Sequence, residues 1–375
     1  YISHIHSDHC ESKTLQKLNK AIPIIILDRK PNFLEKMLRG EGFLNLVLIP
    51  EGKKFSIEPG LKVETFGAGS SHIASNVIDS SILLDFDGYI VLNCNDNKPE
   101  ESFCKNLVKR YKNIDLAFIP AGGGSGYPAM YKNLSNKDKK LKTEAALEAF
   151  ARIFTKAVDI LKPKVAVPVA GGFVVKGPHS ETVNWYQCRR FNHLEIIEFY
   201  ENYGSHKDTK IIALQPEMEM DAELGKVTKG EYHVWSKTEL DAHFKQIAKE
   251  PVHKLISTNR SMKSLPNIFK AVRKNLWEKQ IRNKMLPDYY VYFELSDWPK
   301  LFELPLHKEE IKEISNKDKL NEPYLKMSLN QDTLLEWFLG FEDFNMLDSG
   351  HRIEFFRSPE VYVVEAYYLM SLLRI

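Results

Sequence analysis

The sequence predicts an α/β fold, because short apolar runs alternate with amphipathic helical segments through its first half. Runs such as 21–27 (AIPIIIL) and 165–169 (VAVPV) have the continuous apolar character of strands buried on both faces of a sheet. The segment 143–161 instead repeats apolar residues at helical spacing. With 375 residues, 43% of them hydrophobic, the chain can bury one large core or two ordinary ones.

The expected elements follow this rhythm along the chain. Apolar runs predict strands at 21–27, 44–50, 62–69, 114–119 and 165–169, and a hairpin over 80–96 that turns at Asp87-Gly88. Helical spacing predicts helices at 10–19, 101–111 and 143–161, and later at 239–249, 269–284 and 365–375. Thr143 is the expected cap of the third helix, which ends before Pro163. Two further strands are expected at 289–295 and 351–356.

Composition narrows the class of protein. Lys and Arg number 52 against 50 Asp and Glu, and a net charge of +2 gives no reason to expect a nucleic-acid partner. The basic run at 269–284 is interpreted as a solvated helix face rather than an anion site. The four cysteines form no Cys-x-x-Cys pair, which favours a reducing, cytoplasmic location. No apolar run approaches the roughly 18 residues of a membrane helix, so a soluble protein is expected.

A dense cluster of potential metal ligands lies near the start of the chain. The segment 3–9 (SHIHSDH) follows two apolar residues and carries three imidazoles and a carboxylate. We expect His4 and His6 to project together, while Asp8 and His9 turn toward a second position. Imidazole and carboxylate ligands suit zinc or ferrous iron, whereas magnesium and calcium prefer oxygen ligands. The alternative interpretation is a histidine-rich surface turn.

Two later residues complete the expected site. His72 follows the strand expected at 62–69 through a Gly-Ala-Gly-Ser-Ser turn, and we predict that it is the third ligand of the first metal. Asp96 ends the expected hairpin, where its carboxylate is suited to bridge two ions. An Asx turn before Pro99 is the alternative for Asp96. Asp8 and Asp96 are the predicted catalytic carboxylates.

A glycine-rich loop, 121–128 (AGGGSGYP), follows the strand expected at 114–119. Glycines let a backbone approach a substrate phosphate closely, so a substrate role is predicted. A glycine-rich turn without a ligand is the alternative. The expected substrate contacts are Gly123, Gly124, Ser125 and Tyr127, together with Gly171 and Phe173 after the strand at 165–169.

These motifs together resemble the metallo-β-lactamase superfamily and, within it, the CMP-N-acetylneuraminate hydroxylase branch. The histidine cluster is specific to the superfamily. The glycine loop and 162–174 (KPKVAVPVAGGFV) specify the branch, and 350–353 (GHRI) with 356–359 (FRSP) is similar to the ending of that branch's chains. The resemblance implies a four-layer αββα sandwich over 1–215, with metals at one edge between the sheets. It implies a family-specific extension over 216–375 that packs near the active site.

The resemblance also implies a division of the ligands. His4, His6 and His72 would hold one metal, Asp8 and His9 would approach a second, and Asp96 would lie between them. Hydrolases of the superfamily usually carry a further histidine where this chain has Ala170. His179 is a candidate replacement, and an ordinary loop histidine is the alternative.

The incomplete second position favours an oxygenase over a hydrolase. Our first hypothesis is an iron-dependent oxygenase acting on a nucleotide-activated sugar or a related acidic small molecule. The second is a zinc-type hydrolase of a phosphoester, lactone or amide. The third is a scaffold that has lost catalysis. Each catalytic hypothesis requires one or two divalent transition metals, iron or zinc.

An oxygenase needs electrons, which the resemblance assigns to a Rieske 2Fe-2S domain on the N-terminal side. No such pairing of cysteine and histidine occurs in these 375 residues. The sequence starts on what looks like the end of a buried strand, Tyr1-Ile2. We therefore expect a missing N-terminal part, and the cluster of an oxygenase would lie there or on a separate electron-transfer protein. The alternative is that there is no such cluster and that the chain is a hydrolase on the same scaffold.

Overall fold

The computed structural model describes residues 1–6, 8–30, 32–67, 79–171, 174–177, 180–188, 192–251 and 263–375. The chain divides into two compact units. Unit 1 comprises Tyr1–Gly123, Thr143–Phe173 and Gln187–Asp241, and unit 2 comprises Gly124–Lys142, Val174–Tyr186 and Ala242–Ile375. The sequence analysis placed a boundary after residue 215, between the metal-binding domain and a family-specific extension. This boundary stays a prediction.

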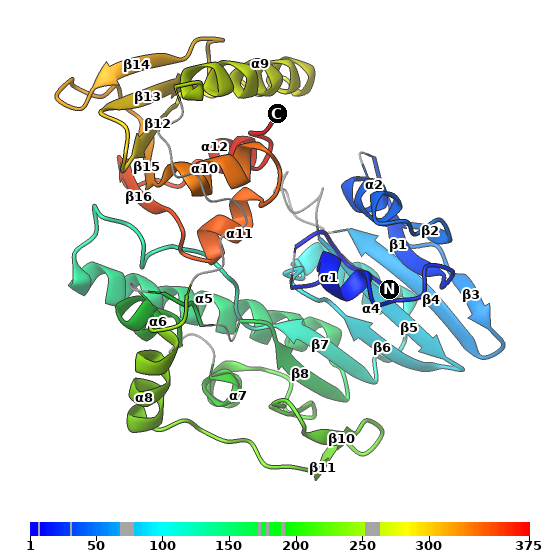
Figure 1. Cartoon of the computed structure of the whole chain (residues 1–375). Helices are drawn as coiled ribbons and strands as arrows, with labels where there is room; N and C mark the ends of the chain where they lie inside the picture. Colours follow the sequence, from blue (N-terminus) through cyan, green and yellow to red (C-terminus); the bar gives the residue numbers. More distant parts are fainter. Residues whose placement is uncertain are drawn as a thin grey trace. The chain divides into compact units, whose positions relative to one another are not determined.

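A seven-stranded sheet forms the centre of unit 1, in the order β3-β4-β5-β6-β7-β8-β9 (Figure 1). Its antiparallel part consists of β3 (Phe55–Glu58), β4 (Leu61–Gly67), β5 (Ser80–Phe86) and β6 (Tyr89–Asn93). Its parallel part adds β7 (Leu116–Pro120), β8 (Val165–Val169) and β9 (Lys210–Ile211) beside β6. The predicted hairpin is confirmed, since Asp87 and Gly88 have φ of 49° and 94° between β5 and β6.

Helices cover one face of this sheet. They are α4 (Glu101–Arg110), α5 (Asn136–Leu161) and α7 (His193–Tyr203). Side chains that alternate along the strands meet these helices in one core, which includes Leu92, Ala117, Cys104, Phe154 and Tyr200. Every second side chain of the strands and the apolar face of each helix therefore pack together in one apolar layer.

The opposite face of the antiparallel strands meets a second sheet. This sheet consists of β1 (Ile24–Asp28) and β2 (Leu46–Pro50), which run parallel. Ile49 packs with Val63 and Ile82 of the large sheet. On the far side of β1 and β2 lie α1 (Ser12–Leu15) and α2 (Phe33–Gly40). The layers are helix, sheet, sheet and helix, so the predicted αββα fold class is confirmed.

A small hairpin covers the parallel strands on that same face of the large sheet. It consists of β10 (Glu219–Asp221) and β11 (Lys226–Lys229), and Met220 packs against the cluster around Val165 and Val167. The chain between β9 and β10 also contributes apolar side chains there.

Several helix predictions were wrong in their limits. The helix expected at 269–284 begins at Leu265, and the helix expected at 365–375 ends at Ser371. The helix predicted at 10–19 is only α1, because Leu15 is the single buried residue of that helix and no apolar face supports a longer one. The helix predicted to start at Thr143 starts at Asn136. Ser135 Oγ accepts a hydrogen bond from Asp138 N (3.2 Å), which caps the helix earlier, and Thr143 is buried within it.

Unit 2 contains a five-stranded sheet in the order β14-β13-β12-β15-β16. These strands are β12 (Tyr290–Leu295), β13 (Lys300–Pro305), β14 (Lys312–Ser315), β15 (Tyr324–Leu329) and β16 (Glu354–Ser358). The helices of this unit are α6 (Ser180–Cys188), α8 (Lys237–Ile247, which begins in unit 1), α9 (Leu265–Asn283), α10 (Gln331–Phe338), α11 (Phe344–Ser349) and α12 (Val364–Ser371). Phe269 of α9 stacks on Phe302 with ring centroids 3.9 Å apart.

The segment after the glycine loop belongs to unit 2 because it pairs with β16. Phe355 N donates to Met130 O (2.9 Å), and Lys132 N donates to Phe355 O (2.7 Å). Two regions more than 200 residues apart in sequence are thus joined by backbone hydrogen bonds. This pairing explains why the unit interrupts the sequence of unit 1.

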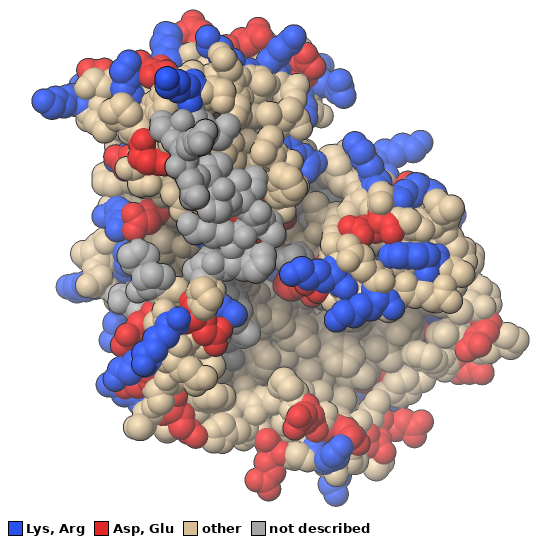
Figure 2. All heavy atoms as spheres, viewed as in Figure 1, with Lys and Arg blue, Asp and Glu red and all other residues tan. Residues whose placement is uncertain are grey.

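The distribution of charge on the surface agrees with the nearly equal numbers of basic and acidic residues. Acidic and basic side chains are mixed on the face that Figure 2 shows. Among the described residues, no helix combines the length and apolarity that crossing a bilayer requires.

Replacing Phe154 by Ala is expected to lower the free energy of unfolding by about 3–5 kcal/mol, because it leaves a cavity in the core between α5 and the sheet. Phe154 is 0% exposed. Chemical denaturation followed by circular dichroism measures the change. Val108→Ala on α4, where the side chain is 37% exposed, is the control and should change stability by less than about 0.5 kcal/mol. Equal effects of the two substitutions would contradict the assignment of this core.

Candidate metal centre

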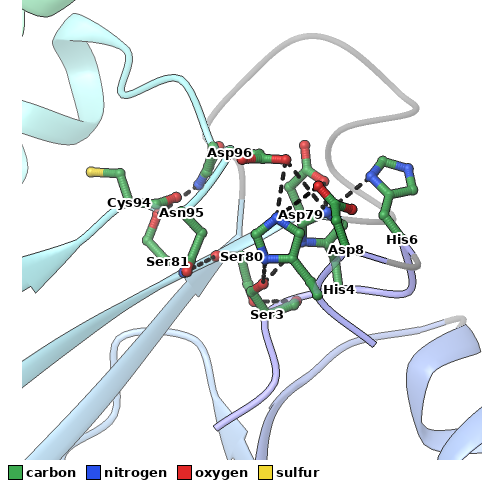
Figure 3. Close-up of polar contacts among 12 residues, drawn as sticks. Ser3, His4, His6, Asp8, Asp79, Ser80, Ser81, Cys94, Asn95 and Asp96 are labelled. Atoms are coloured by element: carbon green, nitrogen blue, oxygen red, sulfur yellow. Dashed lines mark hydrogen bonds and ion pairs between the residues drawn. The ribbon is translucent and has the colours of Figure 1, made fainter. Parts of the chain in front are cut away.

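The β5–β6 hairpin brings two carboxylates to one edge of the large sheet. Its register pairs Ile82 with Asn93, so the residues before β5 and after β6 leave the sheet at the same edge. Asp79 Oδ1 and Asp96 Oδ2 each lie 3.8 Å from Nε2 of His4 (Figure 3). The hairpin register therefore places an acid on each side of the first histidine.

Side-chain hydrogen bonds fasten the N-terminal segment to the same edge. Ser80 Oγ donates to Ser3 O (2.6 Å), and Tyr1 OH lies 2.6 Å from Ser80 Oγ. Ile2 N donates to Ile25 O (3.1 Å), which places the segment beside β1. Tyr1 and Ile2 do not form the predicted strand, since this is their one backbone hydrogen bond to β1 among the contacts described. His4 follows directly and is 0% exposed.

The predicted ligands of the His cluster converge. Nε2 of His4 lies 2.9 Å from Nδ1 of His6, and Nε2 of His9 lies 3.3 Å from Asp96 Oδ2 and 3.6 Å from Asp8 Oδ2. The described residues contain two groups of three potential ligands, His4 with His6 and Asp8, and His4 with His9 and Asp96. Within each group the ligand atoms all lie within 4.8 Å of one another. His4 belongs to both groups.

Burial and charge set the protonation of this cluster. Burial is the main reason that the pKa of His4 is lowered to about 2, and the neighbouring imidazoles of His6 and His9 contribute in the same direction. His4 is therefore neutral at physiological pH, with a lone pair available to a cation. Burial opposes protonation of His9, but the hydrogen bond to Asp96 and its charge outweigh that effect and raise the pKa of His9. The same hydrogen bond lowers the pKa of Asp96 despite its burial.

The arrangement fits a divalent transition metal. Asp79 Oδ1 is buried and has no hydrogen-bond partner, although it faces the imidazole cluster. A buried carboxylate oxygen without a partner is costly unless a cation or a donor compensates for it. Burial raises the pKa of Asp79, which agrees with that cost. Nitrogen and carboxylate ligands suit Fe²⁺ or Zn²⁺ better than Mg²⁺ or Ca²⁺.

Asp79 was not predicted as a site residue, although the hairpin contained the signal. The register pairs residues whose numbers sum to 175, as in Ile82 with Asn93, so the partner position of Asp96 is 79. Counting outward from the turn would have found it.

Lys98 is a second residue that the sequence analysis missed. Its Nζ lies 4.6 Å from the centroid of the Phe150 ring, and the charges of Asp79 and Asp96 act on it. Gly123 makes room for that ring, because a Cβ at this position would lie 2.9 Å from Phe150 Cζ. The ammonium group of Lys98 is thus held over an aromatic ring, and the close approach of that ring requires a glycine at position 123.

The region of Ala170 contains another histidine. Ala170 follows β8 with a φ of 64°, and Gly171 follows with a φ of 102°. Nε2 of His193 lies 3.4 Å from Ala170 O, and its Nδ1 is buried without a hydrogen-bond partner. His193 belongs to neither of the two ligand groups found among the described residues. The predicted residues His72, His179 and Phe173 lie outside the described residues.

The glycine loop is held by carboxylates of unit 2. Ser125 Oγ donates to Asp348 Oδ2 (3.1 Å), and Gly126 N donates to Asp348 Oδ1 (3.1 Å). Tyr127 OH donates to Glu360 Oε1 (3.0 Å). A Cβ on Gly126 would lie 2.7 Å from Asp348 Oδ1, so packing explains this glycine. The substrate contacts predicted for Gly123, Gly124, Ser125, Tyr127 and Gly171 stay predictions.

The C-terminal motifs contribute buried arginines. Arg357 donates from Nε and Nη2 to Glu360 (2.9 and 2.7 Å), and its guanidinium lies 4.8 and 4.9 Å from the ring centroids of Tyr127 and Tyr131. Arg352 Nη2 forms a 2.5 Å ion pair with Glu336, which is 0% exposed. The motifs at 350–353 and 356–359 therefore stabilise unit 2.

Sequence comparison finds relatives of known activity. No protein-family model matches the chain. The cytidine monophosphate-N-acetylneuraminic acid hydroxylase of Mus musculus is 26% identical over 190 residues, which covers 49% of this chain and 31% of the mouse protein. The Danio rerio hydroxylase is 26% identical over 200 residues, with the same two shares. The inactive human hydroxylase is 27% identical over 192 residues, covering 49% of this chain and 36% of the human protein.

The chain is thus similar to these hydroxylases over about half of its own length. The match spans about a third of the length of the curated hydroxylases, so it concerns one part of those proteins.

Solved structures overlap the chain in part. The diiron β-hydroxylase CmlA from Streptomyces venezuelae gives a TM-score of 0.38 at 18% identity, covering 57% of this chain and 43% of CmlA. The metallo-β-lactamase fold protein YhfI from Bacillus subtilis gives a TM-score of 0.34 at 11% identity, covering 57% of this chain and 72% of YhfI.

Replacing Asp348 by Asn is expected to remove a pH dependence of stability. Burial raises the pKa of Asp348 to about 6 from 3.8, so the folded state binds the proton more tightly than the unfolded state. This contribution to stability is present below pH 4 and is lost as the pH rises through 6, a change of about 3 kcal/mol. Denaturation midpoints between pH 4 and 7 measure the difference between wild type and variant.

The exposed Asp297, replaced by Asn, is the control and should keep the wild-type pH profile. A difference between wild type and Asp348→Asn that does not change with pH would show that this carboxyl does not carry the effect.

Proposed function

We propose that this chain is the metal-binding part of an iron-dependent oxygenase that acts on a nucleotide-activated sugar or a related acidic small molecule. One observation carries the proposal: Nε2 of His4 faces Nδ1 of His6 at 2.9 Å, with a carboxylate oxygen of Asp96 3.8 Å from the same Nε2. Two neutral imidazoles and one carboxylate form the ligand set of non-haem Fe²⁺ oxygenases, which leave positions open on the metal. The similarity to hydroxylases of CMP-N-acetylneuraminic acid supports the same reading.

The chain's own residues have separate roles in this proposal. His4, His6 and Asp96 would hold the ion, and Asp8 and His9 would line the more exposed side, where the Asp8 side chain is 66% exposed. A bound iron would supply the redox chemistry. Electrons would come from a Rieske-type iron-sulfur protein or domain, which is the partner we propose.

A zinc-type hydrolase is the second candidate, and the position of Asp96 favours it. Asp96 Oδ2 lies 3.8 Å from Nε2 of His4 and 3.3 Å from Nε2 of His9, so one carboxylate oxygen faces both ligand groups. A carboxylate in that position suits two metals, and a zinc pair would supply Lewis-acid chemistry for a phosphoester, lactone or amide.

The deciding experiment combines metal analysis with turnover. The full chain is purified, its metals are measured by mass spectrometry, and Fe²⁺-loaded and Zn²⁺-loaded samples are incubated with CMP-N-acetylneuraminic acid. A Rieske protein and its reductant are supplied, with and without oxygen. We expect the iron form to yield a product heavier by one oxygen atom, and only when oxygen and reductant are both present.

Turnover by the zinc form without oxygen or reductant would replace the oxygenase proposal by the hydrolase. His6→Ala should weaken metal binding by more than about 100-fold, because it removes a direct ligand. A wild-type chain that binds neither metal, or a His6→Ala variant with unchanged metal content, would sink both proposals.

Lys98→Ala is expected to weaken binding of CMP-N-acetylneuraminic acid about tenfold, since the ammonium group of Lys98, on which the charge of Asp96 acts, is the cation that we propose meets an acidic substrate. Lys98→Arg should retain most of the affinity. Isothermal titration calorimetry on the metal-loaded chain measures both dissociation constants. Lys105→Ala, which removes an exposed lysine paired with Glu101, is the control. Equal affinity of Lys98→Ala and the control would exclude Lys98 from substrate binding.

A further inference from the structure

We propose that Ser3 is a positioning residue whose single hydroxyl orients the imidazoles of both His4 and His9, and so couples the two ligand groups. This inference rests on the proposed metal centre and deepens it. Ser3 Oγ lies 2.9 Å from Nδ1 of His4 and 3.4 Å from Nδ1 of His9. Figure 3 shows the ring of His4 between Ser3 on one side and Asp96 on the other.

The two rings use their nitrogens in the same way. In each ring Nδ1 faces the hydroxyl of Ser3, while Nε2 faces Asp96 Oδ2, at 3.8 Å for His4 and 3.3 Å for His9. The ring centroids are 4.2 Å apart, with planes inclined by 38°. One hydroxyl therefore lies behind two rings whose other nitrogens point to the same carboxylate.

The chemistry of a hydroxyl suits this task. A neutral imidazole carries one N–H, and a hydroxyl oxygen has two lone pairs, so with metal bound Ser3 Oγ would accept from Nδ1–H of both rings. That tautomer would turn both Nε2 lone pairs toward metal ions, in place of their contacts with His6 and Asp96. A metal-binding histidine usually donates its other ring N–H to a carboxylate or carbonyl of its own, which fixes the ring and its tautomer. Here one oxygen serves a ligand in each group.

The surroundings keep Ser3 in place. Ser3 is 5% exposed, and its carbonyl oxygen accepts the hydrogen bond from Ser80 Oγ (2.6 Å). Because Ser80 Oγ donates its proton to Ser3, Tyr1 OH is the donor in the 2.6 Å contact between Tyr1 and Ser80. The backbone of Ser3 is thus fixed to the first residue of β5, and its hydroxyl is directed at the two rings.

The test compares three variants of the full chain by their affinity for metal rather than by activity. Ser3→Ala removes the hydroxyl, and Ser3→Thr retains one. Ser81→Ala is the matched control, because it removes a buried hydroxyl of β5 that contacts Cys94 O and Asn97 but no imidazole. Dissociation constants for Zn²⁺ and Fe²⁺ are measured by competition with a chelator, the latter under anaerobic conditions.

We expect Ser3→Ala to bind both metals about 10–100-fold more weakly than wild type. Ser81→Ala and Ser3→Thr should stay within about threefold of wild type, since both keep a hydroxyl behind the two rings. Nitrogen-15 NMR of the Zn²⁺-loaded chain adds a readout of tautomers. The wild type should show Nδ1–H on two ligand histidines, and Ser3→Ala should show mixed tautomers or exchange broadening at those rings.

The outcomes separate this inference from the function on which it rests. If the wild type binds neither metal, the proposed metal centre fails and the role of Ser3 fails with it. If the wild type binds metal and Ser3→Ala binds it as tightly as Ser81→Ala, only the inference about Ser3 is overturned. Equal thermal denaturation midpoints for the two alanine variants show that an altered affinity is local.

Discussion

The antiparallel register between β5 and β6 is the constraint on which the candidate site depends. It places Asp79 and Asp96 at one edge of the sheet, and hydrogen bonds from the same strands hold that edge together. Asn95 Nδ2 donates to Ser80 O (3.1 Å), and Asn97 Nδ2 donates to Ser81 Oγ (2.9 Å). A shift of one residue would turn these side chains to the other face of the sheet, and the acids would no longer meet the histidines.

The electrostatics of this edge favour a cation. Burial raises the pKa of Asp79, and the nearby charge of Asp96 raises it as well, because two like charges lie in a confined region. His4 is held neutral by burial, so it offsets little of that charge. A divalent ion would stabilise both carboxylates and use the free lone pairs of the imidazoles.

Close packing explains several glycines in the motifs. Gly123 allows the Phe150 ring to approach the backbone in unit 1, while Gly126 allows the Asp348 carboxylate to accept bonds from the loop in unit 2. The spacing of these glycines resembled a phosphate-binding loop, because close packing of a neighbour and binding of a phosphate both require a residue without a side chain. The sequence cannot tell which neighbour approaches, since Phe150 and Asp348 come from distant parts of the chain.

The sequence by itself determined what depends on neighbouring residues. Short apolar runs predicted most strands of unit 1, Asp87-Gly88 predicted the hairpin, and the spacing in 3–9 predicted a dense set of ligands. Only the tertiary structure decided which side chains face that set. The bond from Ser80 to Ser3 spans 77 positions, so no local pattern points to it. The pairing of 130–132 with β16 likewise joins segments with no shared local pattern. Hydrogen bonds between distant segments leave no periodic signal in either one, so the folded chain alone reveals them.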